Sequence, residues 1–238
     1  MGNILGNKPS ENYYKNALSL AFLGDSVTQG VFEVYEKNGK MEFVIDGIGA
    51  YPTKVKEMLK KMYPETPVSF LNSGLNGSNA TAGYERLIKD VIPNKPDLLV
   101  VCFGLNDSNA EMEGIETYKT ALRNIFHAAK EADIETIFMT PNMFNTHSGK
   151  VEPGEILEPL AEVFAKRQLK GVFDAYMDAA RQICREENVT LCDCYAIWKI
   201  MFESGIDITS LLSNGLNHPI RKMHILFAQQ LVHTIHNS

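Results

Sequence analysis

The sequence predicts an α/β protein in which a mainly parallel sheet carries helices on both faces. Short apolar runs, typical of buried strands, alternate along the chain with longer amphipathic runs, typical of helices. Their spacing suits right-handed strand–helix–strand crossovers, which place successive strands in parallel. The 238 residues contain no repeat and no Pro/Gly/Ser-rich linker, so a single domain over 1–238 is expected.

Five strands and five helices follow from these runs. The predicted strands are Leu18–Leu23, Val68–Leu71, Leu98–Phe103, Thr136–Thr140 and Val189–Cys192. The predicted helices are Pro52–Met62, Gly83–Val91, Ile115–Ala132, Leu157–Glu187 with a break near Gly171, and Pro219–Ile235. Ligands of such sheets bind outside the carboxyl ends of the strands, so functional residues are expected directly after each strand.

Two segments lie outside this alternation. Residues 1–16 form an N-terminal extension before the first strand. In Val31–Ile45, two β-prone runs flank Asn38-Gly39, a pair that predicts a hairpin with a type I′ turn. Because this hairpin follows the first strand, it either overhangs the ligand-binding edge or is a surface excursion without a role.

Composition narrows the classes of partner. The apolar and charged fractions, 45% and 22%, are those of an ordinary globular protein. A net charge of -6 argues against a nucleic-acid partner. We find no apolar run of eighteen residues, so no membrane partner is expected. The N-terminus lacks a basic region before its short apolar stretch, which favours a cytoplasmic protein over a secreted one.

Cysteines and histidines give no signal for a metal. The four cysteines are expected to be buried, reduced thiols: Cys102, Cys184, Cys192 and Cys194. No His, Asp or Glu set has metal-ligand spacing, so no metal or organic cofactor is predicted. Nothing in the sequence indicates an oligomeric state.

Four segments contain the residue types that acyl transfer needs. Ser26, in Gly24-Asp25-Ser26, follows the first strand, where a hydroxyl would face the ligand as a nucleophile. The glycines of Asn72–Ser78, after the second strand, permit a close backbone approach to a ligand. Asn106, after the third strand, has an amide that can donate to an oxyanion. His218 precedes the last helix, and histidine is the usual proton carrier for a serine nucleophile because its ordinary pKa lies near neutrality.

Taken singly, each segment has an explanation without catalysis, as a helix cap, a turn or a surface histidine, and for the first two segments that explanation is the simpler one. Their occurrence together, in this order and at strand ends, favours catalysis. Asp25 and Asp107 flank these residues and are expected to hold the loops by accepting hydrogen bonds from backbone N–H groups.

The four segments resemble the blocks that define the SGNH (GDSL-type) hydrolase superfamily. The matching residues are Ser26 in Gly-Asp-Ser, Gly77 at the end of Asn-x-x-x-x-Gly, Asn106 in Gly-x-Asn-Asp, and His218 in His-Pro. The resemblance spans Leu18 to Pro219. It implies a flavodoxin-like, three-layer α/β/α sandwich around a five-stranded parallel sheet.

The resemblance also implies the chemistry of the site. Ser26 would be the nucleophile, and His218 the general base and then the general acid. The N–H groups of Ser26 and Gly77 and the side chain of Asn106 would form the oxyanion hole. The activity implied is hydrolysis of small esters, in many members of the superfamily the removal of acetyl groups from carbohydrate.

The sequence departs from the superfamily at one position. Many members have an acid three residues before the histidine, where this chain has Gly215. His218 could be oriented instead by Asn214, by the more distant Asp207, or by a backbone carbonyl in a Ser–His dyad. We favour Asn214 or a carbonyl. An asparagine can fix the tautomer of the imidazole but cannot neutralise an imidazolium.

The function predicted is therefore that of a serine esterase acting on a small-molecule or carbohydrate ester, most simply an acetyl ester, through a Ser26 acyl-enzyme. An acyltransferase or a thioesterase would use the same residues with another acceptor or substrate. A ligand-binding domain without catalysis is the remaining alternative, and only the missing acid at position 215 points to it.

Overall fold

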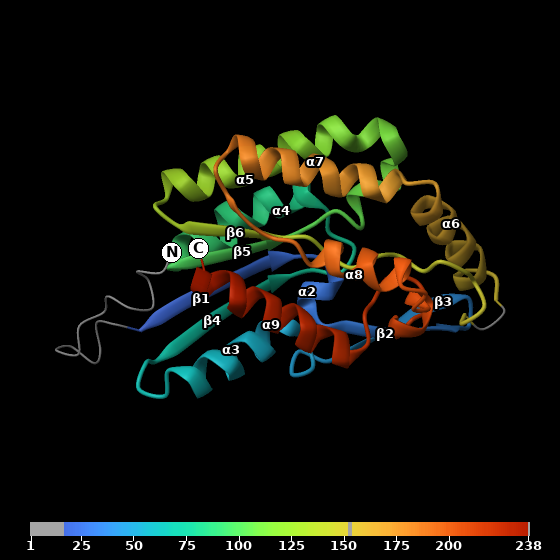
Figure 1. Cartoon of the computed structure of the whole chain (residues 1–238), viewed down its shortest axis with the longest axis horizontal. Coiled ribbons are helices and arrows are strands. Elements are labelled where there is room, and N and C mark those ends of the chain that lie inside the picture. The colour runs from blue at the N-terminus through green and yellow to red at the C-terminus, as the bar shows by residue number, and fades with distance from the viewer. Residues whose placement is uncertain (1–16, 152–153, 238) are drawn as a thin grey trace.

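The sheet has the predicted architecture. The computed structural model describes residues 17–151 and 154–237, so the expected extension over 1–16 lies outside the described residues. Five parallel strands form one sheet in the order β4-β1-β5-β6-β7 (Figure 1). They are β1 Leu18–Gly24, β4 Val68–Gly74, β5 Leu98–Cys102, β6 Glu135–Met139 and β7 Thr190–Cys192. In chain order this is the flavodoxin-like arrangement 2-1-3-4-5.

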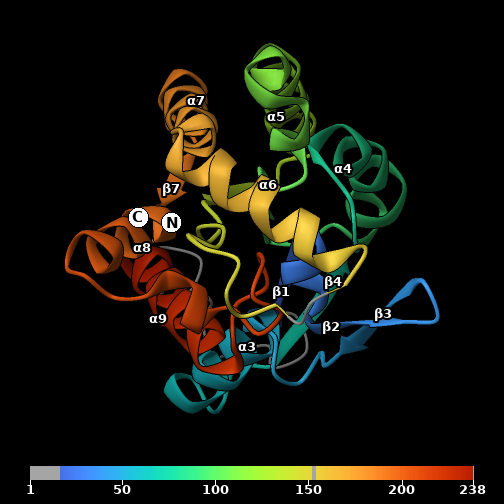
Figure 2. The same cartoon turned by 90° about the vertical axis from the view of Figure 1, so that its right-hand side faces the viewer.

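Helices cover both faces of the sheet, which confirms the three-layer α/β/α class. Helices α3 and α9 pack together on one face, and α4, α5 and α7 lie on the other (Figures 1 and 2). The longer helices are α3 Tyr51–Met62, α4 Ala80–Arg86, α5 Ile115–Glu131, α6 Leu157–Leu169, α7 Val172–Glu186, α8 Cys194–Glu203 and α9 Arg221–Asn237. Because both faces are covered, every residue of β5 is buried.

Two helical segments differ from expectation. Helix α4 begins at Ala80, capped by the side chain of Asn79, and continues as a π-helical turn over Leu87–Val91. Helix α8 was not predicted. It is apolar on most of its positions, so it lacks the alternation that marks an amphipathic helix, and its Trp198 is fully buried in the core. The predicted break at Gly171 is present, with a left-handed φ of 77° between α6 and α7.

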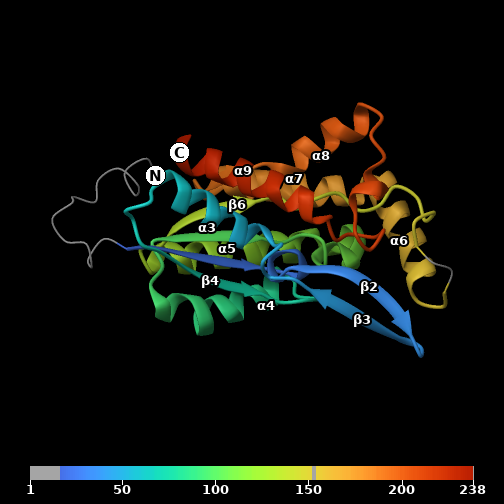
Figure 3. The same ribbon diagram turned by 90° about the horizontal axis from the view of Figure 1, so that it is seen from below.

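The Asn-Gly segment forms a hairpin beyond the carboxyl ends of the strands (Figure 3). Its strands are β2 Val31–Lys37 and β3 Lys40–Ile45, and Asn38 and Gly39 both have positive φ, as a type I′ turn requires. Val34 packs with Leu157 of α6. The hairpin therefore extends outward from the edge of the sheet where the loops after the strands meet, with β2 packed on α6.

A carboxylate of the hairpin fixes it to α6. Glu36 accepts hydrogen bonds from the backbone N–H groups of Glu155 and Ile156, at 3.2 and 3.0 Å. These N–H groups precede the first turn of α6 and have no partner within the helix. Burial is complete at the other end of β2, where Val31 and Phe32 are inaccessible to solvent. The strand is thus held at both ends.

Two buried carboxyls hold the loops after β1 and β5. Asp25 caps the short helix α2 Ser26–Gln29 by accepting from the N–H of Val27 at 2.9 Å. Asp107, in the 3-10 segment Asp107–Gly114, accepts from the N–H of Ala80 at 2.9 Å. Burial raises the pKa of Asp25 to about 7 and that of Asp107 to about 6.

The cysteines and the helices also bear on predictions made from the sequence. All four cysteines are buried free thiols, as expected. Among the described residues, no helix is long and apolar enough to cross a membrane.

Asp25→Asn is expected to stabilise the fold more at about pH 8 than at about pH 5. The pKa of Asp25 is raised from 3.8 to about 7 in the folded chain, so the stability that its neutral form contributes is complete below pH 3.8 and lost as pH rises through about 7. Asparagine keeps the acceptor for Val27 without the buried charge. We expect a gain in Tm on the order of 5 °C at the higher pH, measured by calorimetry. Equal gains at both pH values would contradict the assignment, and Asp178→Asn is the control for loss of one exposed charge.

Candidate active site

Ser26 stands directly after β1, where the chain turns sharply into α2. Glycine is required before it, since a Cβ at Gly24 would lie 2.8 Å from the carbonyl oxygen of Cys102. Asp25 caps α2, and Gly30 ends it with a left-handed φ of 95°. The turn presents Ser26 at the carboxyl edge of the sheet, beside β5, where the strand order reverses.

His218 meets Ser26 from the other end of the chain. The loop before α9 places its Nε2 2.9 Å from the Oγ of Ser26, although 192 residues separate the two in sequence. Only 3% of Ser26 and 4% of His218 is exposed. This is the spatial relation of a nucleophile and its general base.

A backbone carbonyl orients the imidazole. The Nδ1 of His218 lies 3.1 Å from the carbonyl oxygen of Phe32, the second residue of the hairpin strand β2. Since a carbonyl can only accept, Nδ1 carries the proton, and Nε2 is left to accept the hydroxyl hydrogen of Ser26. Of the three alternatives for orienting the ring, the geometry matches the backbone carbonyl of a Ser–His dyad.

Asn214 contacts the histidine loop rather than the imidazole ring. Its Oδ1 accepts from the N–H groups of Leu216, Asn217 and His218 at 3.0, 3.0 and 2.9 Å. Asn214 thereby fixes the backbone on which His218 stands. Asp207 lies away from the ring, because it accepts from the Nε2 of His147 at 3.0 Å.

The conformation of Gly215 explains the departure from the superfamily pattern. Its φ of 66° is left-handed, and a Cβ there would lie 3.1 Å from the Cγ2 of Val151. An aspartate at this position would therefore be strained in this loop. The loop that Asn214 stabilises excludes the usual acid, and β2 supplies an acceptor in its place.

The three groups predicted as oxyanion donors have hydrogens that are not used within the described part of the protein. The N–H groups of Ser26 and Gly77 have no acceptor among the described residues. Gly77 is exposed and adopts a left-handed φ of 76°. One amide hydrogen of Asn106 is donated to the carbonyl of Ser78 at 2.9 Å, which leaves the other for a ligand.

An arginine that the sequence did not single out ties these loops together. The Nη2 of Arg86 donates to the carbonyl of Gly24 at 2.9 Å and to the Oγ of Ser78 at 2.8 Å, and its Nη1 donates to the carbonyl of Ser73. Arg86 thus joins the loops that carry Ser26 and Gly77. No sequence signal marks it, since it is an ordinary cation at the end of a helix.

The environment keeps the imidazole neutral. Burial lowers the pKa of His218 from 6.5 to about 4, although its hydrogen bond to the carbonyl of Phe32 acts in the opposite direction. At neutral pH the ring is therefore in its basic form. An unprotonated Nε2 beside a hydroxyl is the starting state for general-base catalysis.

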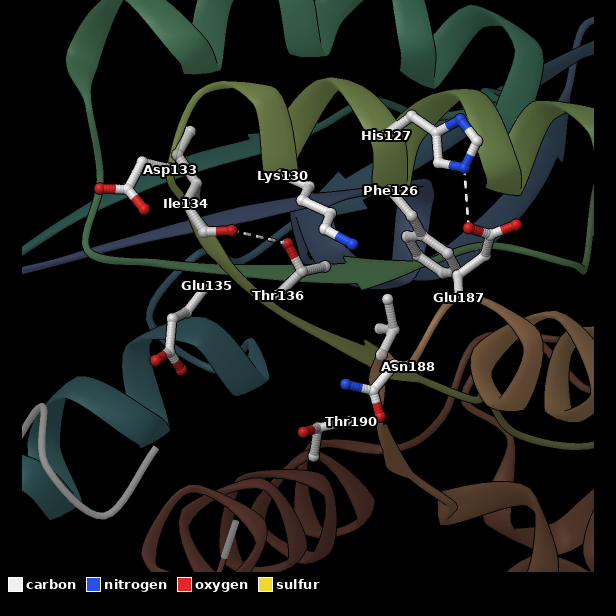
Figure 4. A pocket seen from close by; sticks show the side chains of 11 residues that line it. Phe126, His127, Lys130, Asp133, Ile134, Glu135, Thr136, Glu187, Asn188 and Thr190 are labelled. Carbon is white, nitrogen blue, oxygen red and sulfur yellow. Dashed lines mark hydrogen bonds and ion pairs between the residues drawn. The ribbon is translucent and has the colours of Figure 1, made fainter.

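A separate pocket lies at the opposite edge of the sheet, at the amino ends of β6 and β7 (Figure 4). Its volume is about 270 Å³, and its lining mixes both charge signs, with His127 2.7 Å from Glu187. None of the predicted site residues lines it. Among the described residues, no group of three or more His, Cys, Asp or Glu is placed to hold a metal ion.

Comparison with known proteins found a family model and a relative that match most of the chain. Residues 22–224 match the model of the GDSL-like Lipase/Acylhydrolase family. An acetylxylan esterase of Geobacillus stearothermophilus is 24% identical over 225 residues, which cover 91% of this chain and 93% of that protein.

Solved structures show the same fold. The acetylxylan esterase Axe2 from Geobacillus stearothermophilus superposes with a TM-score of 0.66 at 22% identity, over 92% of this chain and 94% of that one. A putative GDSL-like lipase from Parabacteroides merdae gives a TM-score of 0.70 at 18% identity, over 91% and 94% of the two chains. The match of the family model over nearly the whole chain establishes the relationship that the four segments indicated. The chain therefore belongs to the GDSL-like lipase/acylhydrolase family and is a carboxylic ester hydrolase.

Proposed function

We propose that this enzyme removes small acyl groups, acetyl above all, from carbohydrate esters through an acyl-enzyme on Ser26. The observation that carries the proposal is the 2.9 Å contact between Ser26 Oγ and His218 Nε2, with Nδ1 held on the carbonyl of Phe32. This contact supports a nucleophile with its base in place.

In the acylation step, Ser26 Oγ attacks the ester carbonyl carbon while His218 Nε2 takes the hydroxyl proton. The negative charge that develops on the carbonyl oxygen would be held by the N–H groups of Ser26 and Gly77 and the free amide hydrogen of Asn106. Collapse of the tetrahedral intermediate breaks the bond to the alcohol oxygen. His218 then gives its proton to the departing alcohol.

Deacylation repeats these steps with water as the nucleophile. His218 takes a proton from water, the resulting oxygen attacks the acyl carbon, and the proton returns to Ser26 Oγ as the acid leaves. An alcohol or a thiol in place of water would give acyl transfer from the same intermediate. No cofactor enters these steps.

The choice of substrate rests on two supports. The relative from Geobacillus stearothermophilus is named for its action on acetylated xylan. In addition, Ser26 and His218 are almost fully buried, which favours a small acyl group over a long chain. Acetylated xylo-oligosaccharides are accordingly the first substrates to test.

Ser26→Ala and His218→Ala are each expected to lower turnover of p-nitrophenyl acetate and of an acetylated xylo-oligosaccharide by about 10³-fold or more. The nucleophile or its base is lost, while the oxyanion donors remain. Acetate release measures both reactions. Equal and negligible rates for parent and variants would favour a binding domain, and acetyl groups appearing on an added alcohol would favour a transferase.

The pH profile of kcat/KM should fall on the acid side near pH 4 rather than near 6.5. Only the neutral imidazole can take the serine proton, and burial lowers the pKa of His218 to about 4, so activity is lost as pH falls through that value. Acetate released over a pH series, corrected with Ser26→Ala, gives the profile. A half-maximal rate near pH 6.5 would show that the ring titrates as if exposed.

Asn214→Ala should lower kcat less than His218→Ala does, by about 10-fold, with a lower Tm. The substitution removes an acceptor from three N–H groups of the histidine loop but leaves the ring contacts to Ser26 and Phe32 in place. Asn214→Asp retains the acceptor and serves as the matched variant. Losses as large as those of His218→Ala in both would assign Asn214 a direct role in the reaction.

A further inference from the structure

The carbonyl of Phe32 can orient His218 only if β2 is held in place, because this strand is part of a two-stranded hairpin outside the main sheet. A two-stranded hairpin has little stability of its own. In the Asp-x-x-His pattern of many superfamily members the carboxylate lies on the histidine loop, whereas this acceptor comes from another part of the chain. Glu36 and the burial of Val31 and Phe32 already hold the two ends of β2, and a polar contact between β2 and the histidine segment would in addition fix how the strand is oriented.

Arg221, the first residue of α9, makes that contact. Its Nη1 and Nη2 lie 2.6 and 3.3 Å from the two carboxylate oxygens of Glu33, the residue after Phe32. Its Nε donates to Asp46 Oδ2 at 2.8 Å, and its guanidinium carbon lies 4.2 Å from the centre of the Phe32 ring. The Arg221 side chain thus contacts both strands at the base of the hairpin. It also stacks on the ring of Phe32, the residue whose carbonyl orients His218.

Asp46 is itself fixed to the backbone. Its N–H donates to the carbonyl of Gly30 at 2.7 Å, and its Oδ1 accepts from Ile48 and Gly49 at 3.1 and 2.9 Å. The anchor that Arg221 uses on this side is consequently rigid. Arg221 in turn lowers the pKa of both carboxyls, so Asp46 and Glu33 stay ionised when the pH falls.

These bonds close a circuit. The imidazole of His218 donates to Phe32, Phe32 is joined covalently to Glu33, Glu33 binds Arg221, and Arg221 stands three residues after His218. The imidazole of His218 and the carbonyl of Phe32 are therefore connected twice, once by their own 3.1 Å hydrogen bond and once through the Glu33–Arg221 ion pair. A bidentate guanidinium–carboxylate pair fixes orientation as well as distance.

The stability of the fold does not account for this arrangement. The Arg221 side chain is 44% exposed, and exposed ion pairs contribute little to the free energy of unfolding. Packing of Phe32 is provided separately by His224, whose ring centre lies 4.7 Å away. What the ion pairs add is a defined position for the strand.

From this geometry we propose that Arg221, anchored by Glu33 and Asp46, is a positioning residue for catalysis that keeps the Phe32 carbonyl on His218. The inference rests on the proposed Ser26–His218 dyad. Loss of the guanidinium leaves the dyad atoms intact but lets the imidazole turn away from Ser26.

The test compares Arg221→Met with Arg123→Met in the full chain. Arg123 also binds two carboxylates, Glu186 and Glu187, but on the far side of the molecule, so it matches the loss of a paired exposed arginine. For each variant we would measure Tm, kcat and KM for p-nitrophenyl acetate, and the rate of inactivation by a fluorophosphonate. In that inactivation Ser26 Oγ bonds to phosphorus, fluoride leaves, and the hydroxyl proton passes to His218.

Arg221→Met is expected to lower kcat and the inactivation rate together by about 10- to 100-fold, with little change in KM, because a misplacement of about 1 Å can cost that much. Arg221→Lys and Glu33→Gln should lie between parent and Arg221→Met, since each keeps part of the contact. Arg123→Met should react at the parental rate with a similar change in Tm.

Arg221→Met reacting as fast as Arg123→Met would overturn the inference, and so would a loss no larger than the fraction of unfolded protein measured by circular dichroism. Failure of the proposed function is distinguishable. Turnover by Ser26→Ala at the parental rate would contradict the proposed Ser26–His218 dyad. An inactive Ser26→Ala together with an Arg221→Met variant that reacts at the parental rate would contradict only the role of Arg221.

Discussion

The hydrogen bond from His218 Nδ1 to the carbonyl of Phe32 constrains most of what surrounds it. It selects the tautomer in which Nε2 faces Ser26, and it requires a strand from the first fifth of the chain to meet a loop from its last tenth. Each end of that bond depends on a different set of polar contacts. On the histidine side Asn214 fixes the loop, and on the hairpin side Glu36 and Arg221 fix the strand.

A carbonyl in this position has consequences for the chemistry. It aligns the ring as well as a carboxylate would, but it brings no charge to offset the imidazolium that forms in the reaction. Burial of the ring favours its neutral form and lowers the pKa of His218 to about 4, and the hydrogen bond to Phe32 offsets only part of that effect. In the proposed mechanism, stabilisation of the transition state would then depend more heavily on the proposed oxyanion donors and on the placement of His218.

The sequence predicted the fold class, and it named Ser26 and His218, whose side chains the structure brings within 2.9 Å of each other. Apolar runs marked all five strands, most clearly β1 and β5, which lie inside the parallel sheet and are buried on both faces. Asn38-Gly39 marked the hairpin, because few other residues adopt positive φ in pairs. Helix α8 was not predicted because apolar residues occupy most of its positions, so its sequence lacks the polar face that marks an amphipathic helix.

Which residues orient His218 could not be predicted from the sequence, for a different reason. Every residue has a backbone carbonyl, so the residue type at position 32 does not indicate that this carbonyl accepts a hydrogen bond from His218. Arg221 and Arg86 are likewise ordinary cations in sequence, and their partners lie far away along the chain. Gly215 gave the one usable hint, since the absence of an acid there required another acceptor.

A common principle links the contacts that build the site. Loops at strand ends have no ladder of backbone hydrogen bonds, so their N–H and C=O groups need partners from side chains. Asp25, Asp107 and Asn214 supply acceptors, and Arg86 supplies donors, in each case to the backbone beside a proposed catalytic group. These side chains supply the hydrogen bonds that a helix or a sheet would otherwise provide to the backbone. Because they bond to backbone, they fix positions without using the hydroxyl of Ser26, the imidazole of His218 or the free N–H of Gly77, all of which remain for the ester.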